Sequence, residues 1–398
     1  MSDDPPPEPA PLPRVRIAIP AETLAGERRV AAVPKSIQKL IAAGATVSVE
    51  SGAGVPSGVE DAEYLAAGAA VVVRADALRT ADIVLTVRGL GRDGAHGDDL
   101  EVLPSGAVLA GLLDPLGAGA DAVVALAACG LTVFSLELIP RITRAQEMDA
   151  LSSMSGIAGY QAVLRAATRL PKVFPLLMTA AGTISPARVL VIGAGVAGLQ
   201  AIATAQRLGA IVEAFDVRPE VREQVESLGA RFVESGVDAS GAGGYAKEVE
   251  GDAALQLREV LAKRVAGSDV VITTALIPGR PAPLLVTASM VATMRRGSVI
   301  VDLAAEAGGN CESTVPGAET VTANGVLIDA PFNVPSMMAA DASRLYAHNI
   351  ARFTLDLIKG GRVIIDLEDA ILGPSCVARS GVVLRGPRVE AAAAKEVR

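Results

Sequence analysis

Several residue types are scarce in this chain, and each scarcity excludes a class of protein. The 398 residues include no tryptophan, two histidines and three cysteines. Cys129, Cys311 and Cys376 are far apart and odd in number, so they predict neither a disulfide framework nor a metal site. They are typical of buried or free thiols in a reducing compartment. His96 lies in a Gly/Asp-rich loop and His348 in a helical pattern, and neither position indicates a catalytic role.

Basic residues and long hydrophobic runs are also in short supply. Lys and Arg total 36 against 44 Asp and Glu, so the formal net charge is −8. Nucleic-acid binding needs a concentrated basic surface, and this balance argues against nucleic acid as a partner. The longest uncharged apolar stretch, residues 122–136, is shorter than the ~18 residues that span a bilayer, and Gly130 interrupts it. The sequence therefore predicts a soluble chain.

Apolar residues are abundant and make up 51% of the chain, which excludes general disorder. The length is sufficient for two domains, each with a full core. Residues 1–13 are the exception, because they carry six prolines and two aspartates without an apolar core. They predict a disordered extension rather than a signal peptide.

Strand-like and helical patterns alternate along the rest of the chain, which predicts βαβ units and parallel sheets. Apolar strand patterns occur at residues 15–19, 45–49, 70–73, 83–87, 107–113, 131–138, 231–233, 270–273, 298–301 and 326–328. Helical patterns occur at residues 34–43, 61–67, 121–128, 151–170, 220–228, 253–265 and 287–294.

One stretch, residues 188–218, combines an apolar strand, a glycine turn, an alanine-rich helix and a second strand that ends in an acid. Gly193 allows a tight turn, Gly195 allows the backbone to approach a pyrophosphate, and Gly198 allows the helix to lie close to the strand. Asp216 follows where the ribose-binding acid of an NAD site is expected. The alternative is a glycine-rich turn without a ligand. The predicted cofactor-binding residues in this stretch are Gly193, Gly195, Val196, Gly198, Asp216, Val217 and Arg218.

The end of the chain predicts a discontinuous domain. A long helical pattern at 335–358 begins where the nucleotide-binding domain should be complete, and a strand pattern follows at 363–365. Too little chain remains for a third domain, so we expect this segment to fold back on the first one. The sequence thus predicts an α/β protein with two Rossmann-like, doubly wound parallel-sheet domains. The first comprises residues 14–140 and 335–398, and the second, which binds NAD(H), comprises residues 141–334.

Five motifs, in the same order, resemble those of one family. Residues 140–153 (PRITRAQEMDALSS) are similar to the Arg-Gln-Asp loop of the soluble NAD(H)-binding domain I, the first portion of the alpha subunit, of proton-translocating NAD(P) transhydrogenases. The other four resemble that family's mobile loop, its nicotinamide-pocket segment and two later motifs, at residues 243–248 (GGYAKE), 273–279 (TTALIPG), 301–310 (VDLAAEAGGN) and 333–335 (NVP). The resemblance extends from residue 15 to about residue 379.

The resemblance implies a set of site residues. Arg141, Gln146, Asp149 and Ser152 would surround the nicotinamide, and Tyr245 would lie on a loop that closes over the nucleotide. Further contacts to NAD(H) would come from Gly244, Ala246, Thr274 and Leu276. No metal is implied.

The resemblance also implies partners. It implies a homodimer that docks onto an NADP(H)-binding component and membrane-spanning proton-channel subunits, so that NADP(H) is bound only by the partner. The chain would be cytoplasmic and peripheral to the inner membrane, and active only with those components. Some members fuse this domain to membrane helices, and this chain, which ends at Arg398 without any, resembles the split form or a truncated piece.

The chemistry implied for this family is simple. Hydride transfer between two nicotinamides releases no proton, so the site needs positioning and exclusion of water rather than a general acid or base. The alternative interpretation of Arg141, Gln146 and Asp149 is an ordinary helix N-terminus, and that of Tyr245 is an exposed loop aromatic.

Two other functions remain as alternatives. Alanine dehydrogenase resembles this family but uses a Lys and a His for proton transfer. Arg88 replaces that Lys here, and residues 109–115, where the His would lie, contain none. A non-catalytic NAD(H)-binding regulator is the second alternative, although it would have no need of a polar loop facing the nicotinamide.

Overall fold

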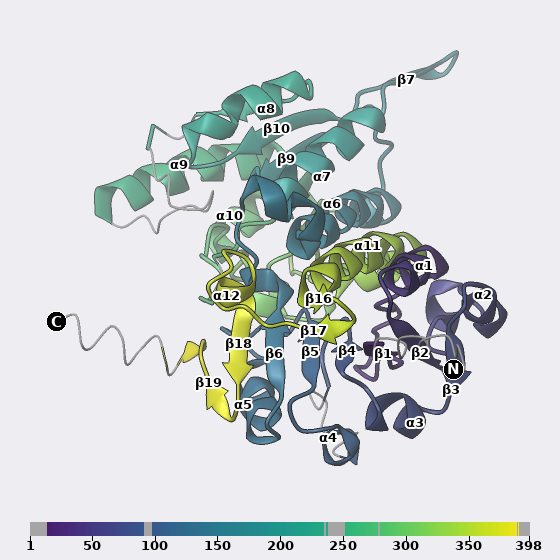
Figure 1. The fold of residues 1–398 in the computed structure, drawn as a ribbon. Helices are drawn as coiled ribbons and strands as arrows, with labels where there is room; N and C mark the ends of the chain where they lie inside the picture. Colours follow the sequence, from purple (N-terminus) through teal and green to yellow (C-terminus); the bar gives the residue numbers. More distant parts are fainter. Residues whose placement is uncertain are drawn as a thin grey trace, which may run out of the picture. The chain divides into compact units, whose positions relative to one another are not determined.

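The structure is a computed structural model, and it describes residues 14–90, 98–234, 236–237, 251–277, 279–387 and 389 (Figure 1). The predicted extension at residues 1–13 lies outside this range. The chain divides into two compact units, which are Met1–Ala150 with Ala339–Arg398 (unit 1) and Leu151–Met338 (unit 2). Each unit is built on its own mainly parallel sheet with helices, so the predicted α/β class is confirmed.

The sheet of unit 1 has eight strands in the order β19-β18-β6-β5-β4-β1-β2-β3. The strands from β6 to β3 are parallel, and the order reverses between β1 and β4, as in a doubly wound fold. Its elements up to residue 148 are β1 Arg16–Ile19, α1 Pro34–Ala42, β2 Thr46–Glu50, η1 Val55–Ser57, α2 Asp61–Ala66, β3 Ala70–Val72, α3 Arg74–Arg79, β4 Ile83–Leu85, α4 Asp98–Val102, β5 Val108–Gly111, α5 Ala120–Ala128, β6 Thr132–Ser135, η2 Leu136–Leu138 and η3 Thr143–Met148.

The C-terminal stretch returns to this sheet. Strand β18 (Cys376–Arg379) pairs antiparallel with β6, and β19 (Val382–Val383) extends the edge (Figure 1). Helix α11 (Ala339–Leu357) buries one face in unit 1 because large apolar residues recur at helical spacing, at Tyr346, Ile350, Phe353 and Leu357. Phe353 meets Phe134 of β6 edge to face, with ring centroids 5.3 Å apart. The hairpin β16 Ile358–Lys359 and β17 Arg362–Val363 and the short helix α12 Leu372–Ser375 complete the stretch.

The sheet of unit 2 has seven strands in the order β11-β10-β9-β12-β13-β15-β14. All neighbours are parallel except β14, and the order reverses between β9 and β12. Its elements are α6 Ala150–Arg169, β7 Leu177–Thr179, β8 Gly182–Ile184, β9 Arg188–Ile192, α7 Val196–Arg207, β10 Ile211–Phe215, η4 Pro219–Val221, α8 Arg222–Ser227, β11 Arg231–Val233, α9 Gly251–Gly267, β12 Val270–Thr273, α10 Ala288–Thr293, β13 Val299–Asp302, η6 Ala305–Ala307, β14 Glu319–Val321, β15 Leu327–Asp329 and η7 Val334–Met338.

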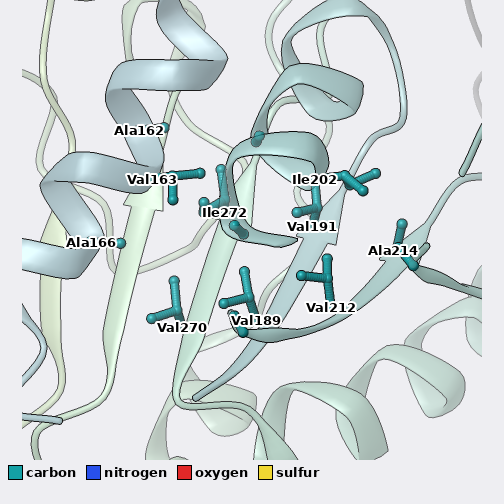
Figure 2. Packing of buried hydrophobic residues seen from close by; sticks show 14 of the residues in the cluster. Ala162, Val163, Ala166, Val189, Val191, Ile202, Val212, Ala214, Val270 and Ile272 are labelled. Carbon is teal, nitrogen blue, oxygen red and sulfur yellow. The ribbon is translucent and has the colours of Figure 1, made fainter. Parts of the chain in front are cut away.

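The sheet of unit 2 is buried on both faces, and strand β9 illustrates this. Successive side chains of a strand point to opposite sides. Val189 and Val191 pack in one cluster with residues of α6 and α7, and Figure 2 shows Val191 beside Ile202 and Val189 between Val270 and Val212. Leu190 and Ile192 pack on the other face with residues of α9 and α10. Burial on both faces requires a continuous apolar run, which is the pattern that the sequence has here.

Some elements differ from their prediction. The helical pattern at 335–358 begins as the 3-10 helix η7 and becomes α-helical only at Ala339. The strand predicted at 363–365 was wrong in extent, since β17 ends at Val363 and forms a two-residue hairpin with β16. Residues 141–149 belong to unit 1, because η3 packs against α11. The hairpin of β7 and β8 and the strands β18 and β19 carry no strong apolar alternation, and the sequence did not predict them.

Two carboxylates hold the loops that follow β4 and β5. Glu22 accepts the backbone N–H groups of Val87 and Arg88 at 2.5 and 2.9 Å. Glu137 accepts those of Leu113 and Asp114 at 3.1 and 2.9 Å, and the hydroxyl of Ser135. Both loops lie at the carboxyl end of the parallel strands, so these acids fix the backbone there.

Glu22 makes the stability of unit 1 depend on pH. Burial raises its pKa to about 7, and the nearby Glu27 carboxylate adds to the rise, while the two backbone N–H groups and Arg29 oppose it. The folded state then holds a proton that the unfolded state loses above its ordinary pKa of 4.5. We therefore expect stability to fall as pH rises from 4.5 to 7, by about 1–3 kcal/mol, because the residue remains partly exposed.

Urea unfolding of the wild type and of Glu22→Gln at pH 5, 6 and 7 measures this effect. The substitution removes the titrating group, so the difference between the two proteins should shrink or reverse across that range. Glu101→Gln, at an exposed position of α4, is the matched control and should follow the wild type. A constant difference between wild type and Glu22→Gln at all three values of pH would contradict the assignment.

Candidate functional site

The glycine turn lies at the carboxyl end of β9, next to the point where the strand order of unit 2 reverses. Gly193 has φ +97°, which is favourable only for glycine, and its N–H donates to the carbonyl of Phe215 at 2.8 Å. A Cβ at Gly198 would lie 1.8 Å from the carbonyl oxygen of Gly193. Around Gly195, the N-cap of α7, a Cβ would meet nothing within 4 Å. Gly193 thus provides the backbone conformation of the turn, Gly198 allows the close packing of α7, and Gly195 faces open space.

Asp216, directly after β10, is connected to this turn. Its Oδ2 accepts the backbone N–H of Ala194 at 2.7 Å, and the residue is 6% exposed. Arg218 donates its backbone N–H and Nε to Oδ1 at 2.9 Å and its Nη2 to Oδ2 at 2.7 Å. The hydrogen bonds to Asp216 raise the pKa of Arg218. The acid predicted to bind a ribose therefore lies beside the glycine turn, with its charge balanced by Arg218.

The chain after β12 completes the rim of the turn. Thr274 donates its hydroxyl to the carbonyl of Gly193 at 3.0 Å. Ala275 is held from both sides by Asn310, whose Oδ1 accepts its N–H at 3.0 Å and whose Nδ2 donates to its carbonyl at 2.9 Å. Leu276 follows and is 45% exposed. Thr274 and Leu276, both predicted to contact the cofactor, are thus on a segment fixed by a buried amide.

Asp302 is the residue that organises this segment. Its side chain is fully buried, at the end of β13. It accepts five hydrogen bonds, from the hydroxyls of Thr273 and Thr314 and from the backbone N–H groups of Ala304, Asn310 and Cys311. The signal in the sequence was an acid placed directly after a fully apolar strand.

The residues of the Arg-Gln-Asp motif lie where the chain passes from unit 1 to unit 2. Arg141 and Gln146 are exposed, Asp149 is partly buried, and all three belong to unit 1. Ser152 is partly buried in the first turn of α6, in unit 2. Gly244, Tyr245 and Ala246 lie outside the described residues, as does Pro278 of the pocket-segment motif.

This site has the features that an adenine dinucleotide requires. Backbone N–H groups at the start of α7 favour a pyrophosphate, the open space at Gly195 would let one approach, and the carboxylate of Asp216 lies beside the turn. In the described part of the chain, His, Cys, Asp and Glu side chains form no group of three that would hold a metal ion. Helices in that part include none with the length and apolar character to cross a bilayer.

Comparison with known proteins identifies the family. The model of the alanine dehydrogenase/PNT N-terminal domain matches residues 18–158, and that of the C-terminal domain matches residues 162–386. The chain is 47% identical over 377 residues to the first portion of NAD(P) transhydrogenase subunit alpha of Rhodospirillum rubrum, and the match covers 93% of this chain and 98% of the relative. This chain belongs to the NAD(P) transhydrogenase branch of the alanine dehydrogenase/PNT family.

Two further similarities agree with this family membership. The chain matches a crystal structure of a transhydrogenase from Sinorhizobium meliloti with a TM-score of 0.81 and 43% identity, over 94% of this chain and 99% of that one. It is 28% identical over 376 residues to alanine dehydrogenase of Mycolicibacterium smegmatis, covering 92% of this chain and 94% of the relative. The family resemblance and the two-domain fold class expected from the sequence are both confirmed.

Substitution of Gly198 and of Gly195 by alanine should have opposite effects on stability and on NADH affinity. Gly198→Ala places a methyl group against the carbonyl of Gly193, so we expect α7 to shift and the free energy of unfolding to fall by several kcal/mol. Gly195→Ala meets no protein atom, so the protein should keep its stability and lose at least about tenfold in NADH affinity. Calorimetric titration and urea unfolding of both variants measure this. Wild-type NADH affinity in Gly195→Ala would contradict the pyrophosphate assignment.

Proposed function

We propose that this chain is the NAD(H)-binding component of a proton-translocating NAD(P) transhydrogenase. Hydride would pass directly between NAD(H) on this chain and NADP(H) on a partner component, coupled to proton translocation by membrane subunits. The observation that carries the proposal is the glycine turn tied to Asp216 by the N–H of Ala194, in a chain that also has the Arg-Gln-Asp motif. The relatives named NAD(P) transhydrogenase subunit alpha support it.

NAD(H) supplies the hydride-carrying ring, and the residues of this chain bind and orient it. The start of α7 holds the pyrophosphate and Asp216 the adenosine ribose. Arg141 offers a fixed charge and several donors, Gln146 a donor and an acceptor for the carboxamide, and Asp149 orients either of them. We assign to Ser152 a further hydrogen bond to the ring and to Tyr245 closure over the nucleotide. Because no proton is transferred, none of these residues needs a tuned pKa.

Direct oxidation of alanine by this chain is less well supported. That reaction needs a proton-transfer pair. Arg88, at the position of the expected Lys, cannot lose a proton usefully, and its backbone N–H is held by Glu22. Residues 109–115 contain no His. The identity to the Mycolicibacterium smegmatis alanine dehydrogenase, 28%, is also lower than the 47% to the Rhodospirillum rubrum transhydrogenase subunit.

The proposal includes an assembly. We propose a cytoplasmic homodimer, attached to the inner membrane through NADP(H)-binding and membrane-spanning partner subunits. The hairpin of β7 and β8 supports self-association, because all of its residues are exposed. Leu176, Met178 and Ile184 expose 54%, 71% and 47% of their surface. A two-stranded hairpin is marginal alone, and apolar patches of this kind mark interaction sites.

The decisive experiment mixes this chain with an NADP(H)-binding transhydrogenase component and follows hydride exchange between NADH and an NADP analogue. We expect exchange only when both proteins are present. NADPH should bind this chain at least about a hundredfold more weakly than NADH, because a 2′-phosphate would face the Asp216 carboxylate, and Arg218 offsets only part of this repulsion. Alanine should not reduce NAD at any pH. Reduction of NAD by alanine without a partner would refute the proposal in favour of alanine dehydrogenase.

Gln146→Asn tests the role of the polar loop. The shorter side chain displaces the amide by about 1 Å, and such misplacement costs on the order of a hundredfold in rate. NADH affinity should stay nearly unchanged, because the ADP half supplies most of the binding energy. Gln38→Asn, at an exposed position of α1, is the control with the same chemical change. Loss of NADH affinity in step with the rate would argue against a positioning role for Gln146.

Met178→Asp tests the dimer. A carboxylate buried in an apolar interface without a partner is unfavourable, so we expect the dimer dissociation constant to rise at least about tenfold. Light scattering at micromolar concentration reports the change. Met178→Leu keeps the apolar contact and should remain dimeric. A wild-type monomer at the same concentration would refute the homodimer.

A further inference from the structure

Short-range backbone hydrogen bonds hold the loop formed by residues 141–149, from the N–H of Ala145 to the carbonyl of Ile142 at 2.9 Å and from that of Asp149 to Gln146 at 3.3 Å. Its centre is the six-residue 3-10 helix η3, whose N-cap residue Ile142 makes no side-chain cap hydrogen bond. Hydrogen bonds in 3-10 helices have poorer geometry than those in α-helices. Two side chains, Ala145 and Met148, are buried, and the polar side chains between them are exposed. Contacts from outside the loop therefore add to these short-range hydrogen bonds in fixing its position.

An ion pair from the C-terminal stretch holds one side of the loop. Arg144 donates its Nη2 to both carboxylate oxygens of Asp369, at 2.7 and 2.6 Å. Asp369 is itself fixed, because its Oδ1 accepts the backbone N–H groups of Ile371 and Leu372 at 2.8 and 3.1 Å. The short helix α12 follows directly and leads into β18, which pairs with β6. The ion pair thus connects the loop to the sheet of unit 1.

A buried amide holds the other side. Asn349 of α11 is 5% exposed, and its Nδ2 donates to the backbone carbonyl of Glu147 at 2.8 Å. The Glu147 carboxylate lies 3.5 Å from Nε of Arg352 and 3.9 Å from Nε2 of His348, on the same helix. Arg144 also lies 3.9 Å from the carboxylate of Asp356 on α11. These contacts, through Arg144 and through Glu147, all come from residues about 200 positions later in the sequence.

We propose that Arg144, Asp369 and Asn349 are positioning residues for hydride transfer. They fix the backbone of the 141–149 loop so that Arg141, Gln146 and Asp149 hold the nicotinamide ring at reacting distance. This assignment rests on the function proposed above. Arg144 and Asp369 contact each other, and Asn349 contacts the backbone of the loop, so their effect passes through the loop.

Because the ion pair of Arg144 and Asp369 is partly exposed, its positioning role can be distinguished from a contribution to the free energy of unfolding. The side chains of Arg144 and Asp369 are 48% and 23% exposed. Ion pairs with this exposure contribute little to the free energy of unfolding. A small shift of the loop is nevertheless costly for the reaction, since a misplacement of about 1 Å changes the rate on the order of a hundredfold. Removal of the pair should therefore leave the protein folded and lower its rate of hydride transfer.

The experiment measures single-turnover hydride transfer and NADH affinity for Arg144→Gln, Asp369→Asn, their double variant and Asn349→Ala, each mixed with an NADP(H)-binding component. We expect rates about 10- to 100-fold lower and dissociation constants for NADH within about twofold of wild type. The double variant should be no slower than the slower single variant, because the two residues act as one unit. Arg144→Lys keeps the charge and should recover some of the rate.

The matched control is the exposed pair of Asp341 and Arg344 on α11, whose Oδ1 and Nη2 atoms are 2.8 Å apart. Arg344→Gln removes an ion pair from the same unit without touching the loop, and its rate should equal that of wild type. Amide hydrogen exchange of residues 141–149 provides a readout that does not depend on turnover. It should accelerate in Arg144→Gln and in Asn349→Ala and remain unchanged in Arg344→Gln.

The outcomes distinguish this assignment from the proposed function. Wild-type hydride transfer with unchanged rates in the Arg144, Asp369 and Asn349 variants overturns the assignment and leaves the function intact. Absence of transfer in the wild-type mixture overturns both. A fall in rate that only follows a fall in the urea midpoint, or that is matched by an equal loss of NADH affinity, also overturns the assignment, because it indicates a structural or binding role.

Discussion

Helix α7 starts so close to the end of β9 that no side-chain carbon fits between them. The Cβ that Gly198 lacks would lie 1.8 Å from the carbonyl oxygen of Gly193. This approach brings three strands to one point, because Thr274 after β12 donates to that same carbonyl and Asp216 after β10 accepts the N–H of Ala194. The segment after β12, the Asp216 carboxylate and the start of the helix are therefore all positioned by one close contact, and a change there moves all of them together.

Buried or partly buried acids perform a related task at the carboxyl ends of both sheets. Glu22 and Glu137 in unit 1, and Asp216 and Asp302 in unit 2, each accept backbone N–H groups from the loops beside them. Loops at this edge lack sheet partners for their N–H groups, and a buried carboxylate satisfies several donors at once. The cost is desolvation of the charge, which is visible in the raised pKa values of Glu22 and Glu137. The two units thus use the same means to shape the loops around their strand ends.

Local patterns in the sequence predicted the regions of this structure that local forces decide. The glycine spacing predicted a tight turn between a strand and a helix, and the position of Asp216 at the end of the next strand predicted an acid beside that turn. The structure has both features side by side. The roles of Asp302 and Asn310 did not follow, because each depends on partners that come together only in the folded chain. The hairpin of β7 and β8 was not predicted either. All of its residues are exposed, so its sequence lacks the alternation of buried and exposed positions by which a strand is recognised.

The 141–149 loop illustrates this limit most fully. Its sequence identified the polar residues that we assign to the nicotinamide, since side-chain chemistry is a local property. Its shape depends on Asp369 and Asn349, which return to unit 1 only after the whole nucleotide-binding unit has been traversed. The rate of a reaction without acid–base catalysis depends on the geometry of the reactants, because no shifted pKa can compensate for a misplaced ring. The discontinuous first domain thus has a physical consequence: the C-terminal stretch that completes its sheet also supplies the contacts that fix the loop.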